Sequence, residues 1–233
     1  MADLELTKMG HLKFLVRKGS SDIKAIEEVV KRRGYRRSGF EVDGPKWIDL
    51  GANVGAFAIL AAFGGAKVIA YEPEPATFEI LKRNVALNGF EDQITLYNRA
   101  VVADPSKKYV AFSVNSANGN YWRSSTVHKW RGGELMSVRA EHWTTAVKQG
   151  WDVKMDIEGA EMPVLEAMVK AGQLPPRLVY EWSFDIDGSI PRFQGVVAGL
   201  RKAYKNVAYS RFDETVPVWG ASWFPPCRTV WCW

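Results

Sequence analysis

Short apolar runs alternate with amphipathic segments along most of this chain. Trp47, Ile48 and Leu50 form the pattern of a short buried strand, and the alanine-rich apolar segment 56–63 behind them is typical of a helix. The same alternation recurs downstream and predicts parallel strands joined by right-handed helical crossovers. The predicted core strands span residues 46–51, 67–72, 93–100, 151–156 and 178–183, and the predicted core helices span residues 56–63, 75–88, 162–171 and 192–204.

The segment before this core has a different pattern. Residues 4–6 and 12–16 flank a short turn and predict a hairpin. Residues 23–33 carry apolar side chains at helical spacing, with Asp22 as the expected N-cap and Gly34 as the expected stop. We therefore expect a hairpin and a helix that cover the core as an extension, not as a separate domain.

The alternation breaks after the third predicted core strand. Residues 109–114 and 135–139 are typical of two antiparallel strands around a polar loop, 115–133, which is long for a compact domain. This loop mixes polar and aromatic side chains and is the first candidate for a substrate lid. Two further strand patterns, 207–209 and 229–233, predict a closing antiparallel pair at the end of the chain.

The composition is that of an ordinary globular protein. The chain has 233 residues, 47% of them hydrophobic and 24% charged, which suits one α/β domain with additions. No apolar run approaches the roughly 20 residues that span a membrane, and the N-terminal segment lacks the apolar core of a signal peptide. Cys227 and Cys232 indicate neither a disulfide framework nor a zinc site. We therefore expect a cytoplasmic protein that does not associate with membranes.

The first candidate site is the turn between the first core strand and its helix. It reads Asp49-Leu-Gly51-Ala-Asn53-Val-Gly55, and Glu72 closes the next strand about twenty residues later, where an acid binds ribose hydroxyls in nucleotide-binding folds. The spacing is not Gly-x-Gly-x-x-Gly, and Asp49 would repel a pyrophosphate but suits a cationic amino-acid end. The pattern therefore favours S-adenosylmethionine, with a nicotinamide oxidoreductase as the alternative.

A second candidate site lies where the fourth predicted strand ends. Asp156, Glu158 and Glu161 crowd this strand end, and Glu181 and Asp185 follow from the fifth strand. Because ligands of doubly wound sheets bind at the carboxyl ends of the strands, we expect this cluster beside the glycine turn, with Asp156 facing the active site. Asp156 with Glu181 or Asp185 could hold a divalent metal ion, but no all-protein cage is visible and a metal is not expected.

Four segments together carry a family resemblance. They are Asp49-Leu-Gly-Ala-Asn-Val-Gly55, Tyr71-Glu-Pro-Glu-Pro75, Leu81-Lys-Arg-Asn-Val-Ala-Leu-Asn-Gly89 and Lys154-Met-Asp-Ile-Glu-Gly-Ala-Glu161. Over residues 12–183 the chain resembles the FkbM family of S-adenosylmethionine-dependent methyltransferases. The resemblance implies an α/β fold: a Rossmann-like, seven-stranded, mostly parallel sheet with helices on both faces and an antiparallel last strand. We expect one domain, with residues 1–45 as the extension and residues 46–233 as the catalytic core.

The resemblance also implies roles for single residues. Gly51, Asn53 and Gly55 match the cofactor turn of the family, Glu72 matches its ribose-binding acid, and Asp156 and Glu158 match its second acidic motif. The expected cofactor-binding residues are Asp49, Gly51, Ala52, Asn53, Gly55, Glu72, Pro73, Ala100 and Asp156. Family members commonly carry Leu-Asp before the second motif. This chain has His142-Trp-Thr-Thr145 there, which indicates an unusual substrate.

The expected reaction is an in-line transfer of the sulfonium methyl group, in which the protein mainly positions the two reactants. A general base helps when the nucleophile is a hydroxyl, and the candidates are Asp156 and Glu158, followed by His142. The expected substrate-binding residues are Tyr121, Trp122, Arg123, Ser125 and Glu181.

The sequence leaves more than one acceptor open. The preferred interpretation is a hydroxyl of a sugar or of a natural-product-like small molecule. The alternative is nucleic acid, at a ribose 2′-hydroxyl or a cap, because Lys31-Arg-Arg-Gly-Tyr-Arg-Arg37 is a basic run with an aromatic residue inside it. The net charge of +5 and the pI of about 9.1 permit this alternative without requiring it. A non-catalytic binding module with the same fold is a further alternative, and the oligomeric state is not determined.

Overall fold

The computed structural model describes residues 3–32, 34–115, 124–129, 133–183, 186, 189–210 and 227–233. Tyr121, Trp122 and Arg123, which the sequence predicts to bind the substrate, lie outside these described residues, and so does Asp185.

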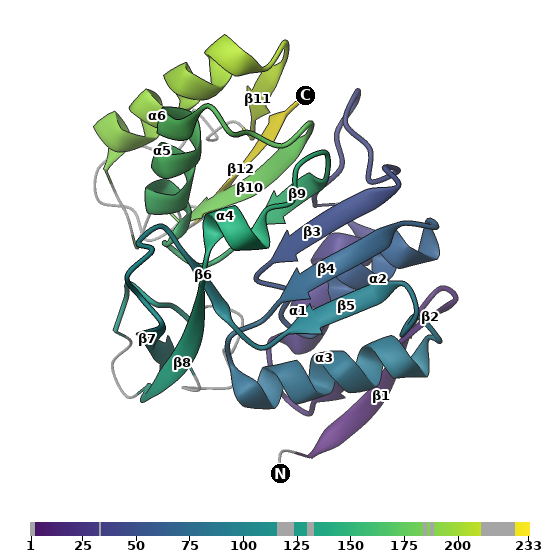
Figure 1. Cartoon of the computed structure of the whole chain (residues 1–233). Coiled ribbons are helices and arrows are strands. Elements are labelled where there is room, and N and C mark those ends of the chain that lie inside the picture. Colours follow the sequence, from purple (N-terminus) through teal and green to yellow (C-terminus); the bar gives the residue numbers. More distant parts are fainter. Residues whose placement is uncertain are drawn as a thin grey trace, which may run out of the picture.

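A twisted sheet of seven strands forms the centre of the described part of the chain (Figure 1). Its strands are β3 (Lys46–Leu50), β4 (Lys67–Tyr71), β5 (Ile94–Tyr97), β9 (Asp152–Met155), β10 (Leu178–Ser183), β11 (Val207–Tyr209) and β12 (Cys227–Cys232). They lie in the order β11-β12-β10-β9-β3-β4-β5. The pairs from β10 to β5 are parallel, and β12 runs antiparallel to both β10 and β11. The predicted Rossmann-like sheet with an antiparallel last strand is confirmed.

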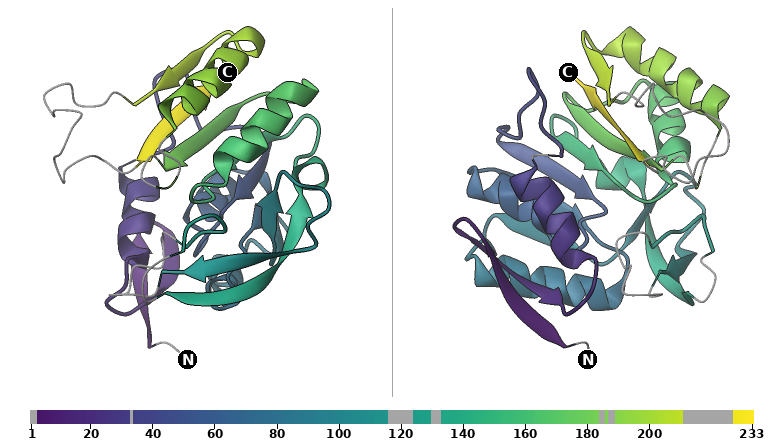
Figure 2. Two further views of the ribbon diagram at one scale, coloured as in Figure 1. Left: turned by 90° about the vertical axis from the view of Figure 1, so that its left-hand side faces the viewer. Right: turned by 180° about the vertical axis from the view of Figure 1, so that it is seen from behind.

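Helices cover both faces of this sheet (Figure 2). One face carries α2 (Ala56–Phe63) and α3 (Pro75–Leu87), and the other carries α4 (Trp143–Ala146), α5 (Glu161–Ala171) and α6 (Ile190–Ala203). Strand β3 shows why both faces need cover, because its side chains alternate between two cores. Trp47 packs edge-on against Phe57 of α2, with ring centroids 5.2 Å apart, whereas Ile48 packs into the core that contains Leu165 of α5.

The extension consists of a hairpin and a short helical segment that lie on the same face as α2 and α3 (Figure 2). The hairpin pairs β1 (Leu4–Met9) with β2 (Leu12–Arg17), as predicted. A helical segment is present where predicted, but only its first part is α-helical: α1 (Asp22–Ile26) passes directly into a wider π-helical turn, η1 (Glu27–Lys31). Asp22 is not the N-cap. It is the first residue of α1, and its carboxylate accepts hydrogen bonds from the main chain and guanidinium of Arg17 instead.

Three further strands form a small sheet beside the carboxyl ends of the core strands (Figure 1). They are β6 (Ala100–Val102), β7 (Tyr109–Val114) and β8 (Glu134–His142). The antiparallel pairing of β7 with β8 was predicted, but the single strand predicted for residues 93–100 is wrong. The chain leaves the core sheet after Tyr97, and Ala100 begins β6, which pairs with β8. This turn away from the core brings Ala100 to the carboxyl ends of the core strands, where the candidate site lies.

Among the described helices, none is both long and apolar enough to cross a membrane.

Asn84 of α3 holds the extension to the core. Its side chain is fully buried, and its Oδ1 accepts a hydrogen bond from Leu15 N at 2.6 Å. Its Nδ2 donates to Leu15 O at 3.1 Å and to Val54 O at 2.9 Å. One amide therefore satisfies main-chain groups of the hairpin and of the turn that follows β3.

We predict that Asn84→Ala lowers the free energy of unfolding by about 2–4 kcal/mol, because buried main-chain groups lose their partners. The matched control is Asn88→Ala. Asn88 makes the equivalent bonds to Lys13 N and O near the surface, where water replaces them, so its loss is expected to cost less than about 1 kcal/mol. Urea unfolding measures both, and equal losses would show that Asn84 does not have this role.

Candidate active site

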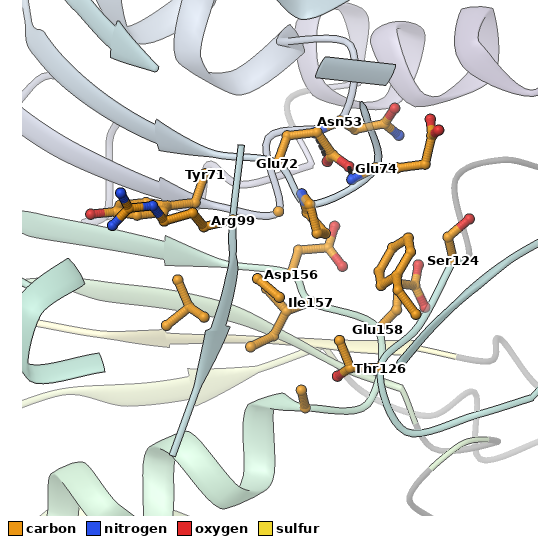
Figure 3. Close-up of a pocket in the computed structure, with 16 residues that line it drawn as sticks. Asn53, Tyr71, Glu72, Glu74, Arg99, Ser124, Thr126, Asp156, Ile157 and Glu158 are labelled. Atoms are coloured by element: carbon orange, nitrogen blue, oxygen red, sulfur yellow. Dashed lines mark hydrogen bonds between the residues drawn. The ribbon is translucent and has the colours of Figure 1, made fainter. Parts of the chain in front are cut away.

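Two adjoining pockets lie at the carboxyl ends of β3, β4 and β9. The first spans about 640 Å³ and the second about 570 Å³, and both volumes include space that is open to solvent. Four residues line both pockets, namely Gly51, Asn53, Asp156 and Glu158. In Figure 3, which shows the first pocket, Asn53, Glu72 and Glu74 lie along one side, and Asp156, Glu158 and Thr126 lie along the other. The glycine turn and the second acidic motif thus meet, as the sequence predicts.

At Gly51 the turn after β3 contacts both neighbouring strands, β4 on one side and the end of β9 on the other. Its φ is +82°, and a Cβ atom at this position would overlap the carbonyl oxygen of Asp156. The amides of Gly51 and Ala52 both donate to Tyr71 O, at 3.0 and 2.9 Å. The turn is therefore held between β4 and β9, and only glycine fits there.

The rest of the turn divides between binding positions and structural ones. Ala52 lines the second pocket. Gly55 lines neither pocket, and it begins α2 with a φ of +99° where a Cβ atom would press on Leu81. The structure therefore gives Gly55 a packing role, and its expected contact with the cofactor stays a prediction.

Asn53 presents an unpaired acceptor. Its φ of +52° is in the left-handed region, which asparagine tolerates better than most residues. Its main-chain amide donates to Glu72 Oε2 at 2.9 Å. Its buried side-chain Oδ1 has no hydrogen-bond partner among the described residues, so this atom suits a ligand donor in either pocket.

Glu72 is a buried carboxylate that faces the first pocket. Its Oε1 accepts from Glu74 N and its Oε2 from Asn53 N, both at 2.9 Å. Burial raises the pKa of Glu72 to about 7, against the opposing effect of these two amides. Asn98 Nδ2 donates to Glu72 O at 2.8 Å and to Pro73 O at 3.0 Å, which orients the main chain around the acid. Pro73 and Ala100 line the same pocket.

Asp49 does not reach either pocket. It is fully buried behind the turn, and its Oδ1 lies 2.9 Å from Lys154 Nζ, which also donates to Gly51 O at 2.7 Å. Burial alone would lower the pKa of Lys154, but the carboxylates of Asp49 and Asp156 outweigh it and raise that pKa. The structure therefore places Asp49 behind the turn, where it pairs with Lys154, and Lys154 in turn holds Gly51 O; the expected contact of Asp49 with a cofactor stays a prediction.

Asp156 and Glu158 lie where the two pockets join. Asp156 N continues the sheet by donating to Leu50 O at 2.9 Å, and Asp156 Oδ2 accepts from the hydroxyl of Tyr35 at 2.7 Å. Glu158 has a φ of +50°, and its Oε2 accepts from Ser183 Oγ at 3.2 Å. The strained Glu158 backbone is typical of residues that a functional site holds in place.

Tyr35 is a site residue that the sequence analysis missed. It comes from the extension, is 7% exposed, and lines the second pocket. Burial, reinforced by the charge of Asp156, raises the pKa of Tyr35 well above its usual value, so the phenol stays a hydrogen-bond donor. The one available signal was its place as the single aromatic residue within the basic run 31–37.

Of three further residues that the sequence predicts for catalysis or substrate binding, only one lines either of the two pockets. His142 lines neither pocket, and its ring nitrogens contact Thr144 Oγ1 at 2.7 Å and Ala103 O at 3.0 Å, so the structure does not bring it to the site. Ser125 is 1% exposed and donates to Glu158 O at 2.5 Å, which supports the acidic loop, and it lines neither of these two pockets. Glu181 of β10 lines the second pocket.

The sequence suggests Asp156 with Glu181 or Asp185 as the possible ligands of a divalent metal ion, and Asp185 lies outside the described residues. Within the described ranges, no three His, Cys, Asp or Glu side chains converge as metal ligands. The side chain of Glu161 is also not available as a metal ligand, because it is fully buried and accepts hydrogen bonds from Ile157 N and Gly159 N. Burial, with a further contribution from Asp156, raises the pKa of Glu161 to about 8.

Four features occur together: the strand order, the glycine turn, Glu72 at the end of the next strand, and the second acidic motif. They define a Rossmann-like methyltransferase that uses S-adenosylmethionine. The Methyltransferase FkbM domain matches residues 49–203. The chain belongs to the FkbM methyltransferase family.

Comparison with known proteins gives matches to enzymes that modify tRNA. A tRNA(Phe) (4-demethylwyosine(37)-C(7)) aminocarboxypropyltransferase from Pyrococcus horikoshii is 42% identical over 52 residues, which are 22% of this chain and 19% of that protein. A tRNA (guanine(37)-N(1))-methyltransferase from Phytophthora infestans is 40% identical over 50 residues, which are 22% of this chain and 12% of that protein. The match therefore covers only a small part of either relative.

A solved structure supports the fold. The tRNA (uracil-54, C5)-methyltransferase from Pyrococcus abyssi, in complex with S-adenosyl-L-homocysteine, superposes with a TM-score of 0.52 at 14% identity. The similarity covers 98% of this chain and 43% of that one, so the chain spans less than half the length of this structural relative.

We predict that Gly51→Ala destabilises the protein far more than Gly150→Ala. Both glycines have a positive φ, so each substitution carries the roughly 1–2 kcal/mol penalty of the left-handed region. A Cβ atom at Gly150 meets no described atom within 4 Å, whereas one at Gly51 overlaps Asp156 O. Thermal unfolding compares the two variants, and similar losses would contradict the tight contact at Gly51.

We also predict that S-adenosylhomocysteine binds more weakly as the pH falls below about 7. The expected ribose-binding role of Glu72 requires an ionised carboxylate to accept from both hydroxyls, so protonation should weaken affinity by up to tenfold for each pH unit below the Glu72 pKa of about 7. Calorimetry at pH 6 and pH 8 measures the change. Glu72→Gln should bind weakly with little pH dependence, and a variant that keeps the wild-type pH profile would remove Glu72 from the site.

Proposed function

We propose that the protein transfers the methyl group of S-adenosylmethionine to a nucleotide of RNA. The adenosine of the cofactor occupies the first pocket, and the acceptor enters the second. The observation that carries this arrangement is the set of residues common to both pockets, because the methyl group must lie where cofactor and acceptor meet. Asp156 and Glu158 are the two acids at that junction.

The first pocket suits an adenosine. Glu72 lies at its wall with both carboxylate oxygens held by main-chain amides, ready to accept from the 2′- and 3′-hydroxyls of ribose. Tyr71, Val101 and Phe112 supply apolar surface for the flat base. The turn at Gly51 and Asn53 then leads toward the second pocket.

The second pocket suits an acceptor that donates hydrogen bonds. Its carboxylates are those of Glu28, Asp156, Glu158 and Glu181, and its one lysine, Lys154, is already paired with Asp49. A phosphate would be repelled there, but a ribose hydroxyl or a base N–H can donate to these oxygens. A carboxylate that accepts the proton of the attacking group acts as a general base.

Two observations favour RNA over the sugar or small-molecule acceptor that the sequence analysis preferred. The relatives that match in sequence act on tRNA. The basic segment 31–37 also contributes Tyr35 to the wall of the second pocket, and Arg32 and Arg37 of the same segment are exposed. Exposed cations hold phosphates while a flipped nucleotide enters the pocket.

The direct test is transfer of labelled methyl from S-adenosylmethionine to total tRNA, followed by digestion and mass spectrometry of the nucleosides. A single methylated nucleoside supports the proposal and identifies the atom. Labelling of a small-molecule extract with no labelling of RNA would replace the RNA acceptor while leaving the methyltransferase assignment intact.

We predict that Asp156→Asn lowers methyl transfer by at least about 100-fold, as expected for loss of a positioned general base, while S-adenosylhomocysteine still binds. His142→Ala is the matched control, because its ring lies outside both pockets and its loss should leave the rate within about threefold of wild type. A fully active Asp156→Asn enzyme would contradict the role of Asp156.

We predict that the double variant Arg32→Ala/Arg37→Ala weakens tRNA binding and reduces the slope of log affinity against log salt by about 2, one for each lost phosphate contact. The control is Arg201→Ala/Lys202→Ala, which removes the same charge from exposed positions at the end of α6. Filter binding between low and moderate salt measures both, and equal slopes in the two variants would show that the basic segment does not hold RNA.

A further inference from the structure

Arg17, at the end of β2, is a buried cation that the proposed reaction does not use. It is 5% exposed, and its partner Asp22 is fully buried. Arg17 Nε donates to Asp22 Oδ2 at 2.9 Å, and Arg17 Nη2 donates to Asp22 Oδ1 at 2.7 Å. This two-point pairing fixes the plane of the guanidinium.

The remaining nitrogen of the guanidinium points to the start of α3. Arg17 Nη1 donates to Thr77 Oγ1 at 3.0 Å and lies 3.9 Å from Glu74 Oε2. Glu74 is the N-cap of α3, and its carboxylate accepts from Ala76 N at 2.9 Å and from Thr77 N at 2.6 Å. Arg17 therefore contacts the first turn of α3 through both a hydroxyl and a carboxylate.

That first turn is continuous with the wall of the first pocket. Glu74 lines this pocket, and its amide donates to Glu72 Oε1 at 2.9 Å. Figure 3 shows Glu72 and Glu74 side by side on the same wall. A displacement at the start of α3 would thus move the donor that orients the Glu72 carboxylate.

The charges around Glu72 add an electrostatic link. The charged groups near it are Glu74 at the start of α3, Arg17 of β2, and Arg99, Asp156 and Glu158 around the pocket. Burial dominates the raised pKa of Glu72, and Glu74 raises that pKa further while Arg17 lowers it. Arg17 thus favours the ionised form of Glu72, which is the form that accepts both ribose hydroxyls.

We propose that Arg17 is a positioning residue for the cofactor, which holds the Glu72–Glu74 wall of the first pocket from the extension. It acts through Asp22, Thr77 and Glu74 and touches no ligand itself. The proposal rests on the assignment of the first pocket to the cofactor, and it holds for whichever acceptor is methylated.

Three substitutions separate geometry from charge. Arg17→Lys keeps the positive charge but loses the forked pairing with Asp22 and the bond to Thr77. Thr77→Val keeps the shape of the side chain and the ion pair but removes the acceptor of Arg17 Nη1. Arg17→Met removes the charge. Arg177→Lys is the control, since Arg177 makes a similar two-nitrogen contact with Asp152 at the amino ends of β9 and β10, away from the pockets.

Calorimetric titration with S-adenosylhomocysteine from pH 6 to pH 9, alongside thermal unfolding, gives the readout. Arg17→Lys should weaken binding about tenfold and Thr77→Val about threefold, with the wild-type pH midpoint kept in both, as expected for loss of one or two hydrogen bonds. Arg17→Met should also move the midpoint to higher pH. Arg177→Lys should lose stability but bind as wild type does.

Two results would overturn the positioning role, and they distinguish its own failure from failure of the pocket assignment. If Arg17→Lys and Thr77→Val are folded and bind S-adenosylhomocysteine within twofold of wild type, while Glu72→Gln binds weakly, the positioning role is overturned. If Glu72→Gln also binds as wild type does, the assignment of the first pocket fails, and the positioning role fails with it. Thr77→Val keeps the test valid even if both Arg17 variants fail to fold.

Discussion

The ion pair between Lys154 and Asp49 is the interaction on which the site depends. Both side chains are almost completely buried, and removing one partner of such a pair costs about 3–5 kcal/mol because the other charge is left without compensation. The two residues lie opposite each other in neighbouring parallel strands, β9 and β3. Lys154 Nζ reaches past this pair to Gly51 O, so one ammonium group joins two strands and the turn between the pockets. Asp49, from the glycine-turn motif, and Lys154, from the second acidic motif, therefore support the turn together.

The extension is part of the site and not only a cover. Asn84 ties its hairpin to the turn that contains Val54, and Tyr35 donates to Asp156 in the second pocket. Arg17 reaches the start of α3 beside the first pocket. Each contact joins the residues before β3 to a different part of the core. Both pockets therefore depend on a segment outside the matched family domain, residues 49–203.

The core of the fold could be predicted from the sequence because its signals are local. The apolar strand patterns and the glycine turn specify β3, α2 and the parallel order, and helix 56–63 agrees with the structure at both ends. Glu72 and Asp156 were predictable because strand ends share one edge of a parallel sheet.

Other features depend on contacts that local patterns do not show. Asp49 looks like a binding residue until its burial beside Lys154 is known, and Tyr35 looks like part of a solvated basic run until its hydroxyl meets Asp156, 121 residues away. The departure of β6 from the core sheet and the π-helical turn at Glu27–Lys31 have no periodic signal of their own. His142 was attractive for its chemistry, but its ring nitrogens are engaged by Thr144 and Ala103.

The most direct test of the cofactor site is a titration of the wild-type protein at pH 8 with S-adenosylhomocysteine and, separately, with NADH, each with and without total tRNA. We expect saturable binding of one S-adenosylhomocysteine per chain and no binding of NADH, because the turn at Gly51 has no glycine triplet for a pyrophosphate. A folded protein that binds NADH, or that fails to bind S-adenosylhomocysteine under either condition, would contradict the assignment of this site.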